Sequence, residues 1–186
     1  MNLIKLLILI FAVSCSMSPQ KNADHSFNYI SGSSISDISY DVEIINTKKQ
    51  KWSNNQRYIF YLDNGKVFKT YGLENNIEII NIDNIEIQSL KEGEVLNSSA
   101  KIKFTNPETN YLNIFYEYKI VSFANYPKYQ DQDSYLVEEK YNIPLIRWSG
   151  KNYFLFDKQT KAIKKSTQKL APFSRKIYIV HKKIAA

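Results

Sequence analysis

Apolar and polar residues alternate through the middle of the chain. The apolar positions are Leu112, Ile114, Tyr116, Tyr118 and Ile120, with Asn113, Glu117 and Lys119 between them. A period of two residues is typical of a half-buried β-strand. Residues 101–105 alternate in the same way, and the turn-forming residues 106–110 lie between the two runs. The pattern therefore predicts a β-hairpin over residues 101–121.

A second hairpin is predicted nearer the N-terminus. The alternating segments 57–62 and 66–71 flank Asp63-Asn64-Gly65. Asn-Gly suits the positive φ angles of a type I′ turn, which joins two antiparallel strands. Further β-like runs cover residues 135–141, 153–156 and 175–183.

Two segments leave the element type open. Residues 77–87 form a further β-like run, but Asn and Asp interrupt its isoleucines and leave its assignment ambiguous. Residues 35–50 fit either one short helix or an edge strand.

The expected fold class is all-β. Many short strands separated by turns indicate an antiparallel β-barrel or a barrel-like sandwich built from hairpins, with at most one or two short helices. The chain has 186 residues, which suits one domain. Its hydrophobic content of 44% and aromatic content of 14% exclude a disordered chain.

The first fifteen residues have the layout of an exported lipoprotein. Lys5 precedes an apolar run over residues 6–13, which is too short to span a bilayer and is typical of a secretory signal peptide. Ala12-Val13-Ser14-Cys15 resembles the bacterial lipobox, whose cysteine carries diacylglycerol and further acyl chains such as palmitate. Acyl chains on Cys15, the only cysteine, would anchor the chain stably to a membrane.

These features predict three segments. Residues 1–14 form a lipoprotein signal peptide, residues 15–34 a lipidated flexible tether, and residues 35–186 a single β-barrel-like domain. Ser16 follows the lipid-bearing cysteine, where an Asp retains many lipoproteins in the inner membrane. The chain is therefore expected to be anchored in the outer membrane with its domain facing the periplasm.

Charge is distributed unevenly along the chain. The net charge is +7, yet residues 158–186 hold nine Lys and Arg and no acid. Such a segment either binds an anionic polymer or lipid headgroups, or places its lysines on the solvated side of strands. Asp131, Asp133, Glu138 and Glu139 form a small acidic cluster in the sequence. Nucleic acid is not an expected partner of an exported lipoprotein.

No catalytic or metal-binding motif is present. The chain lacks a Gly-rich phosphate loop and a Gly-x-Ser-x-Gly elbow, and its two histidines are far apart. Glu138 and Glu139 point to opposite faces if they lie on one strand, so they cannot act as a carboxylate pair. Asp63 and Asp157 are expected to serve turns. We predict no enzyme activity, no metal and no cofactor.

Two segments resemble one known family, the YjbF/GfcB-type lipoproteins. The first contains Trp52-Ser53 and the hairpin Asn64-Gly65-Lys66 that ends in Thr70-Tyr71-Gly72-Leu73. The family shows Trp-x-Ser followed by Asn-Gly-Arg and Thr-Ala-Gly-Leu, so Lys66 replaces the Arg and Tyr71 the Ala.

The second segment begins at Trp148-Ser149-Gly150 and ends near Pro172. The family shows Asn-x-Tyr-Trp-Val-Asp, a Thr-Gly turn, and Ser-x-Gln before a Pro. Here Phe154 replaces the Trp and Lys161 the turn Gly. The matching positions are Asn152, Tyr153, Asp157, Thr160, Ser166, Gln168 and Pro172.

The resemblance implies a barrel-like lipoprotein that assists capsule or exopolysaccharide assembly or export without catalysis. It also implies an outer-membrane β-barrel protein and a periplasmic protein of the same system as partners, and an anionic polysaccharide as a possible ligand. Candidate polymer contacts are Trp52, Tyr71, Trp148, Asn152, Gln168, Lys164 and Lys165. The aromatic and amide residues among them could instead pack the barrel and satisfy turn backbone groups. The alternatives are a periplasmic small-ligand-binding lipoprotein, with its site inside the barrel, or a polysaccharide-modifying enzyme.

Overall fold

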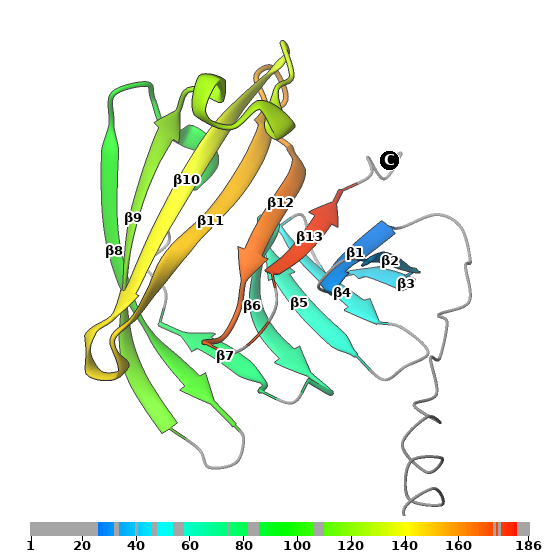
Figure 1. Cartoon of the computed structure of the whole chain (residues 1–186), viewed down its shortest axis with the longest axis vertical. Helices are drawn as coiled ribbons and strands as arrows, with labels where there is room; N and C mark the ends of the chain where they lie inside the picture. Colours follow the sequence, from blue (N-terminus) through cyan, green and yellow to red (C-terminus); the bar gives the residue numbers. More distant parts are fainter. Residues whose placement is uncertain are drawn as a thin grey trace, which may run out of the picture.

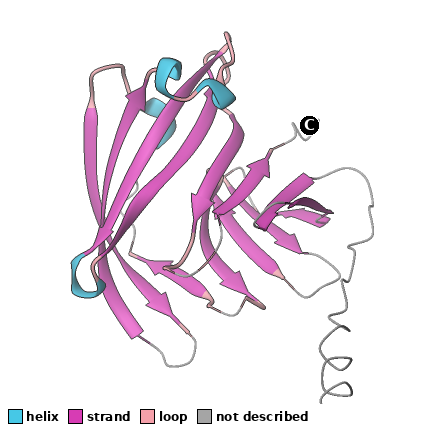
Figure 2. Cartoon of the chain, viewed as in Figure 1, coloured by secondary structure: helices cyan, strands magenta, loops and turns pink. Residues whose placement is uncertain are grey.

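The structure is a computed structural model that describes residues 26–31, 34–39, 41–45, 48–53, 58–73, 75–81, 86–105, 110–172, 174 and 176–181. Strands dominate these residues, as Figure 2 shows. The strands are β1 (Ser26–Ser31), β2 (Ser34–Ser39), β3 (Asp41–Ile44), β4 (Lys49–Ser53), β5 (Ile59–Asp63), β6 (Lys66–Tyr71), β7 (Ile77–Ile80), β8 (Val95–Phe104), β9 (Asn110–Val121), β10 (Ser134–Ile143), β11 (Trp148–Asp157), β12 (Ile163–Lys169) and β13 (Lys176–Val180).

All the strands belong to one antiparallel sheet. Their order is β2-β1-β13-β12-β11-β10-β9-β8-β7-β6-β5-β4-β3. The outermost strands, β2 and β3, are consecutive in the chain, so the two ends of the strand order come back to the same segment. Figure 1 shows the result, a strongly curled sheet that wraps around its own inner face. The predicted all-β, barrel-like fold class is confirmed.

Both predicted hairpins are present. In the first, Asp63 pairs with Lys66, and the intervening Asn64 and Gly65 have φ angles of 47° and 77°. Both angles are positive, as a type I′ turn requires. This turn type is common in hairpins because its twist matches that of the flanking strands. In the second, β8 pairs with β9 from Val95↔Lys119 to Phe104↔Asn110. Residues 106–109 of its turn lie outside the described residues.

The helical content differs in detail from the expectation of at most one or two short helices. Four 3₁₀ helices of three residues each occur in the described part of the chain, and no α-helix does. Two of them begin at a proline, and a third is capped by Ser122, whose hydroxyl accepts a hydrogen bond from the Ala124 N–H. Short turns of this kind suit the connections of a hairpin sheet. They are η2 (Ile87–Ser89), η3 (Phe123–Asn125), η4 (Pro127–Tyr129) and η5 (Pro144–Ile146).

The segments left open by the sequence are mostly strand. Residues 35–50 contribute to β2, β3 and β4, and residues 77–87 contain β7 and the start of η2. The expected signal peptide and Cys15 lie outside the described residues. Strand β1 falls within the range expected to be tether, and it pairs with β13 through Phe27↔Ile179. Among the described residues, strand pairing therefore begins at Ser26, within the range predicted to be tether.

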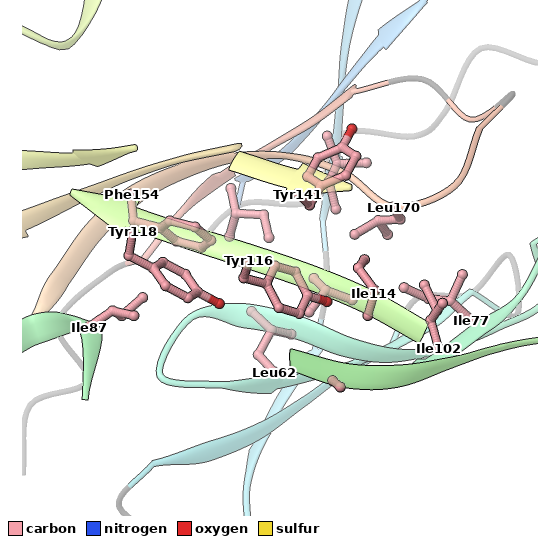
Figure 3. Packing of buried hydrophobic residues seen from close by; sticks show 14 of the residues in the cluster. Leu62, Ile77, Ile87, Ile102, Ile114, Tyr116, Tyr118, Tyr141, Phe154 and Leu170 are labelled. Atoms are coloured by element: carbon pink, nitrogen blue, oxygen red, sulfur yellow. The ribbon is translucent and has the colours of Figure 1, made fainter. Parts of the chain in front are cut away.

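The core fills the inner face of the curled sheet, as Figure 3 shows. On β9, Ile114, Tyr116 and Tyr118 are buried, whereas Phe115 between them is 48% exposed. This is the face assignment that the alternation predicts. A second, smaller cluster covers the outer face of β10 and β11, where Tyr129 of η4 packs with Leu136, Tyr153 and Leu155.

Candidate functional site

Four polar side chains lie deep inside the curled sheet and form the feature that we call the buried polar centre. They are Lys66 of β6, Glu139 of β10, Asn152 of β11 and Gln168 of β12. Their exposed fractions are 7%, 0%, 5% and 1%. Burying so many polar groups is costly unless each finds a partner, so their contacts decide what the centre does.

An ion pair occupies the middle of the centre. The Lys66 ammonium donates to Glu139 Oε2 at 2.5 Å and to the Tyr118 hydroxyl at 2.8 Å. It also lies 3.5 Å from the centroid of the Tyr116 ring, a cation–π contact. Asn152 Nδ2 donates to the other carboxylate oxygen of Glu139 at 2.6 Å. The charges of Lys66 and Glu139 therefore compensate each other, and both carboxylate oxygens accept hydrogen bonds.

Gln168 joins the two halves of the sheet. Its Oε1 accepts from the Val67 N–H at 2.9 Å, and its Nε2 donates to the Gly65 carbonyl at 2.8 Å. Nε2 also donates to Ser166 Oγ at 2.9 Å. The Gln168 side-chain amide thus hydrogen-bonds the backbone at the start of β6 in the way that a neighbouring strand would. Strands β6 and β12 are far apart in the strand order, so this contact crosses the interior of the curled sheet.

The glycine of the first hairpin permits this approach. Gly65 has a positive φ, and a Cβ at this position would overlap the Ile163 side chain of β12. The hairpin tip therefore lies directly against β12. The two segments that resemble the lipoprotein family meet here, because Gly65 and Lys66 belong to the first and Asn152 and Gln168 to the second.

The electrostatics of the centre favour fixed protonation states. Burial lowers the pKa of Lys66, while Glu139 opposes that shift. Burial and the nearby Glu139 carboxylate raise the pKa of Tyr116 and of Tyr118 well above their usual value. Both phenols stay protonated near neutral pH, so neither supplies a phenolate base or nucleophile.

A small cavity adjoins the centre. Its volume is about 20 Å³, and its lining includes Lys66, Glu139, Tyr116, Tyr141 and Trp148. The Tyr116 and Tyr141 hydroxyls and the Trp148 indole N–H are buried without a hydrogen-bond partner in the described part of the chain. A cavity of this size has room for about one water molecule and none for a sugar ring. The centre as described is a structural junction that no substrate can enter.

The neighbouring carboxylate, Glu138, lies on the opposite face of β10, as the alternation predicts. It accepts hydrogen bonds from Tyr126 at 2.8 Å and Lys151 at 2.9 Å. Burial opposes its ionisation, but these hydrogen bonds hold the pKa of Glu138 below its usual value. Asp131 pairs instead with Lys164 at 3.2 Å. Glu138, Glu139 and Asp131 therefore pair with different lysines, whereas Asp133 stays beside Asp131, whose Oδ1 accepts from the Asp133 N–H at 3.1 Å.

The residues predicted to contact polymer do not form one site in the structure. Trp148 is buried against Tyr141, with ring centroids 4.7 Å apart, while Trp52 is buried elsewhere and donates from Nε1 to Gln50 Oε1 at 2.9 Å. Tyr71 is 43% exposed. Lys164 lies between Asp131 and Asp157, and Lys165 is half-buried. Trp148, Asn152 and Gln168 thus line one cavity, whereas the others lie apart.

Sequence reasoning did not find the partnership of Lys66 with Glu139. One feature of the sequence could have indicated it. Lys66 stands where the family has an arginine, so both residues place a positive charge at this position. Asp157 does serve a turn, as expected, because its Oδ1 accepts from the backbone N–H groups of Gln159 and Thr160.

The described residues contain neither a metal-binding cluster nor a membrane-spanning helix. No three His, Cys, Asp or Glu side chains gather there in an arrangement that could hold a metal ion. Within the same ranges no helix has the length and apolar character needed to cross a membrane.

The curled antiparallel sheet defines an all-β fold that has a solved example. The fold is similar to the crystal structure of the hypothetical lipoprotein YmcC from Escherichia coli (K12), with a TM-score of 0.65 and 15% identity, covering 88% of this chain and 86% of that one. The chain belongs to the family described as group 4 capsule polysaccharide lipoprotein GfcB, YjbF, whose sequence model matches residues 38–180. This confirms the resemblance inferred from the two hairpin segments. A comparison with curated protein sequences finds no match.

Proposed function

We propose that the chain is a non-catalytic outer-membrane lipoprotein that assists capsule or exopolysaccharide assembly or export as a scaffold or polymer-binding module. The observation that carries this proposal is membership of the capsule polysaccharide lipoprotein family over residues 38–180. The lipobox-like N-terminus supports the proposed anchoring through acylated Cys15, and we place the domain on the periplasmic side as part of the same proposal.

The filled interior supports an external function. Pockets that bind small molecules have volumes of about 300–1,000 Å³. The cavity beside the buried polar centre has about 20 Å³. This argues against the alternative of a periplasmic small-ligand-binding protein with its site in the barrel interior.

The arrangement of carboxylates also argues against catalysis. Glycosidases hold two carboxyl groups about 5–9 Å apart across an open cleft. Glu138 and Glu139 face opposite sides of β10, and each is almost fully buried by hydrogen-bonded partners. A polymer would therefore be held on the outside of the domain, where Tyr71 and the partly exposed Lys164 and Lys165 remain candidates for contact.

Deletion of the gene in a polysaccharide-producing strain tests the proposal. We expect less polysaccharide at the cell surface and unchanged levels of nucleotide-sugar precursors. The wild-type gene should restore the polymer, and a Cys15→Ala variant should restore it less well because the chain loses its anchor. Unchanged surface polysaccharide in the deletion strain would refute the proposed function.

A further inference from the structure

Strand β9 extends beyond the strand that pairs with it. The β9–β10 ladder ends at Asn142↔Phe115, while β9 continues back to Asn110. On its other side β9 stays paired with β8 as far as Phe104↔Asn110. In Figure 1 the lower ends of β8 and β9 diverge from the β10–β11 connection. Residues 111–114 therefore have no ladder partner on the β10 side in the part of the chain that is described.

Exposed apolar side chains gather beside this open edge. Seven large hydrophobic residues are well exposed in the described chain, and four of them lie on β9 or η5. These are Tyr111 at 57%, Phe115 at 48%, Leu145 at 80% and Ile146 at 43%. Concentration of exposed apolar surface at one place is a mark of an interaction site.

A groove separates the β9 edge from η5. Its volume is about 620 Å³, and its lining consists of Lys101, Tyr111, Leu112, Asn113, Phe115, Pro144 and Leu145. Five of these residues are apolar or aromatic, one is a cation and none is an acid. Lys103, which pairs with Tyr111 across the hairpin, places its ammonium 5.7 Å from the centroid of the Tyr111 ring and 4.0 Å from Glu78 Oε2, so it already has an acidic partner.

We propose that the free edge of β9, residues 111–114, accepts an extended strand from a partner protein. The strand would pair with the unpaired backbone groups, place an apolar side chain in the groove beside Leu145, and set an acidic residue near Lys101. An open edge with adjacent side-chain pockets is the arrangement that binds peptides by strand addition.

The chemistry of the site favours a polypeptide over a sugar polymer. An open row of amide N–H and C=O groups is matched by another peptide backbone, and Pro144 and Leu145 offer only apolar surface. Lys101 lines the groove, no acid lines it, and this cation complements an acidic side chain on the incoming strand. This inference rests on the proposed function to the extent that a scaffold for export requires a protein partner.

Photo-crosslinking in the polysaccharide-producing strain tests the occupant. A photoreactive amino acid replaces Leu145 in the full-length lipoprotein, and Val95, which is 51% exposed at the other end of β8, serves as the matched control position. We expect a protein adduct from position 145 and not from position 95. The crosslinked segment should alternate apolar and polar residues and carry an acid. Adducts only with a second copy, with carbohydrate or with lipid, or no adduct at all, would overturn the proposal.

The captured segment is then synthesised as a peptide and added to the purified lipoprotein in detergent. We expect those amides among residues 111–114 whose N–H points away from β8 to gain protection from hydrogen exchange, since the alternate ones already pair with β8. Methylating one of the peptide nitrogens that pairs with β9 should weaken binding by about tenfold, and Leu145→Asp should do the same or more, while Val95→Asp should not. Binding that leaves these amides unprotected would show a different docking mode and refute strand addition.

The two proposals fail in different ways. If Leu145→Asp abolishes peptide binding but deletion of the gene leaves surface polysaccharide unchanged, the docking edge stands and the export function is wrong. If deletion reduces the polymer but no adduct forms at position 145, the function stands and this docking edge is wrong.

Discussion

Replacing Glu139 by leucine would leave the Lys66 ammonium buried without its carboxylate. In the native structure this ammonium is held by Glu139 at 2.5 Å and by the Tyr118 hydroxyl at 2.8 Å, with a side chain only 9% exposed. Removing one partner of a buried ion pair costs about 3–5 kcal/mol, because the remaining charge keeps its desolvation penalty. Asn152 also loses the acceptor for its Nδ2 group, which adds about 1 kcal/mol.

The same reasoning predicts recovery in a double variant. Lys66→Met combined with Glu139→Leu replaces both charges by apolar groups of similar size, and such replacements are often neutral or stabilising by about 1–4 kcal/mol. The single variant should also respond to pH. Burial lowers the pKa of Lys66, so a lysine without its carboxylate loses its proton more readily in the folded than in the unfolded chain. The unfolded chain then binds more protons, and stability rises as the pH approaches 10.5, the ordinary pKa of lysine.

Urea unfolding followed by the fluorescence of the buried Trp52 and Trp148 provides the assay. We expect Glu139→Leu to lower the free energy of unfolding by several kcal/mol at pH 7 and by less at pH 9.5. The double variant should unfold close to the wild type. A loss below about 1 kcal/mol in the single variant, or an equal loss in the double variant, would refute the account of the ion pair.

Three further predictions concern single positions, each measured by the same unfolding assay. Gly65→Ala should cost more than Gly93→Ala, since both have positive φ, which costs about 1–2 kcal/mol, but only Gly65 also meets Ile163. His181 has its pKa lowered to about 3 by burial, against 6.5 when exposed, so stability should fall as the pH drops below 6.5. The fall amounts to about 2 kcal/mol at pH 5, and a His181→Leu variant that shows the same pH dependence would contradict this. Lys161 has a φ of 58°, so Lys161→Gly should raise stability by about 0.5–1 kcal/mol, and a loss would show that the Lys161–Tyr135 cation–π contact matters more.

Local patterns in the sequence predicted the strands and turns well. The alternation of β9 predicted which residues face inward, and Asn64-Gly65 predicted a type I′ turn. Both features depend on residues that are close together in the chain. A period-two pattern or a turn dipeptide therefore predicts them directly.

The buried polar centre could not be predicted in the same way. Lys66 and Glu139 are 73 residues apart, and no local pattern connects them. Alternation shows that Glu138 and Glu139 face opposite sides but not which side is interior, because apolar clusters cover both faces of β10. The roles of Trp148, Asn152 and Gln168 depend on the curl of the whole sheet, which brings the hairpin tip at Gly65 against β12.

The open edge of β9 also could not be predicted from the sequence. Alternation places Tyr111 and Phe115 on one face of the strand. It does not show that they lie beside an open edge, because that depends on the ladder with β10 ending at Phe115. The edge depends on strand lengths, which local propensity sets poorly, and on the position of η5.

Surface polysaccharide in a deletion strain complemented with the double variant Lys66→Met and Glu139→Leu tests the central claim, that the interior of this domain is structural and its function lies outside. We predict polymer at the wild-type level, provided that immunoblotting shows the variant at normal abundance. A stable, abundant variant that leaves surface polysaccharide at the level of the deletion strain would contradict the claim and assign the buried centre a direct part in export.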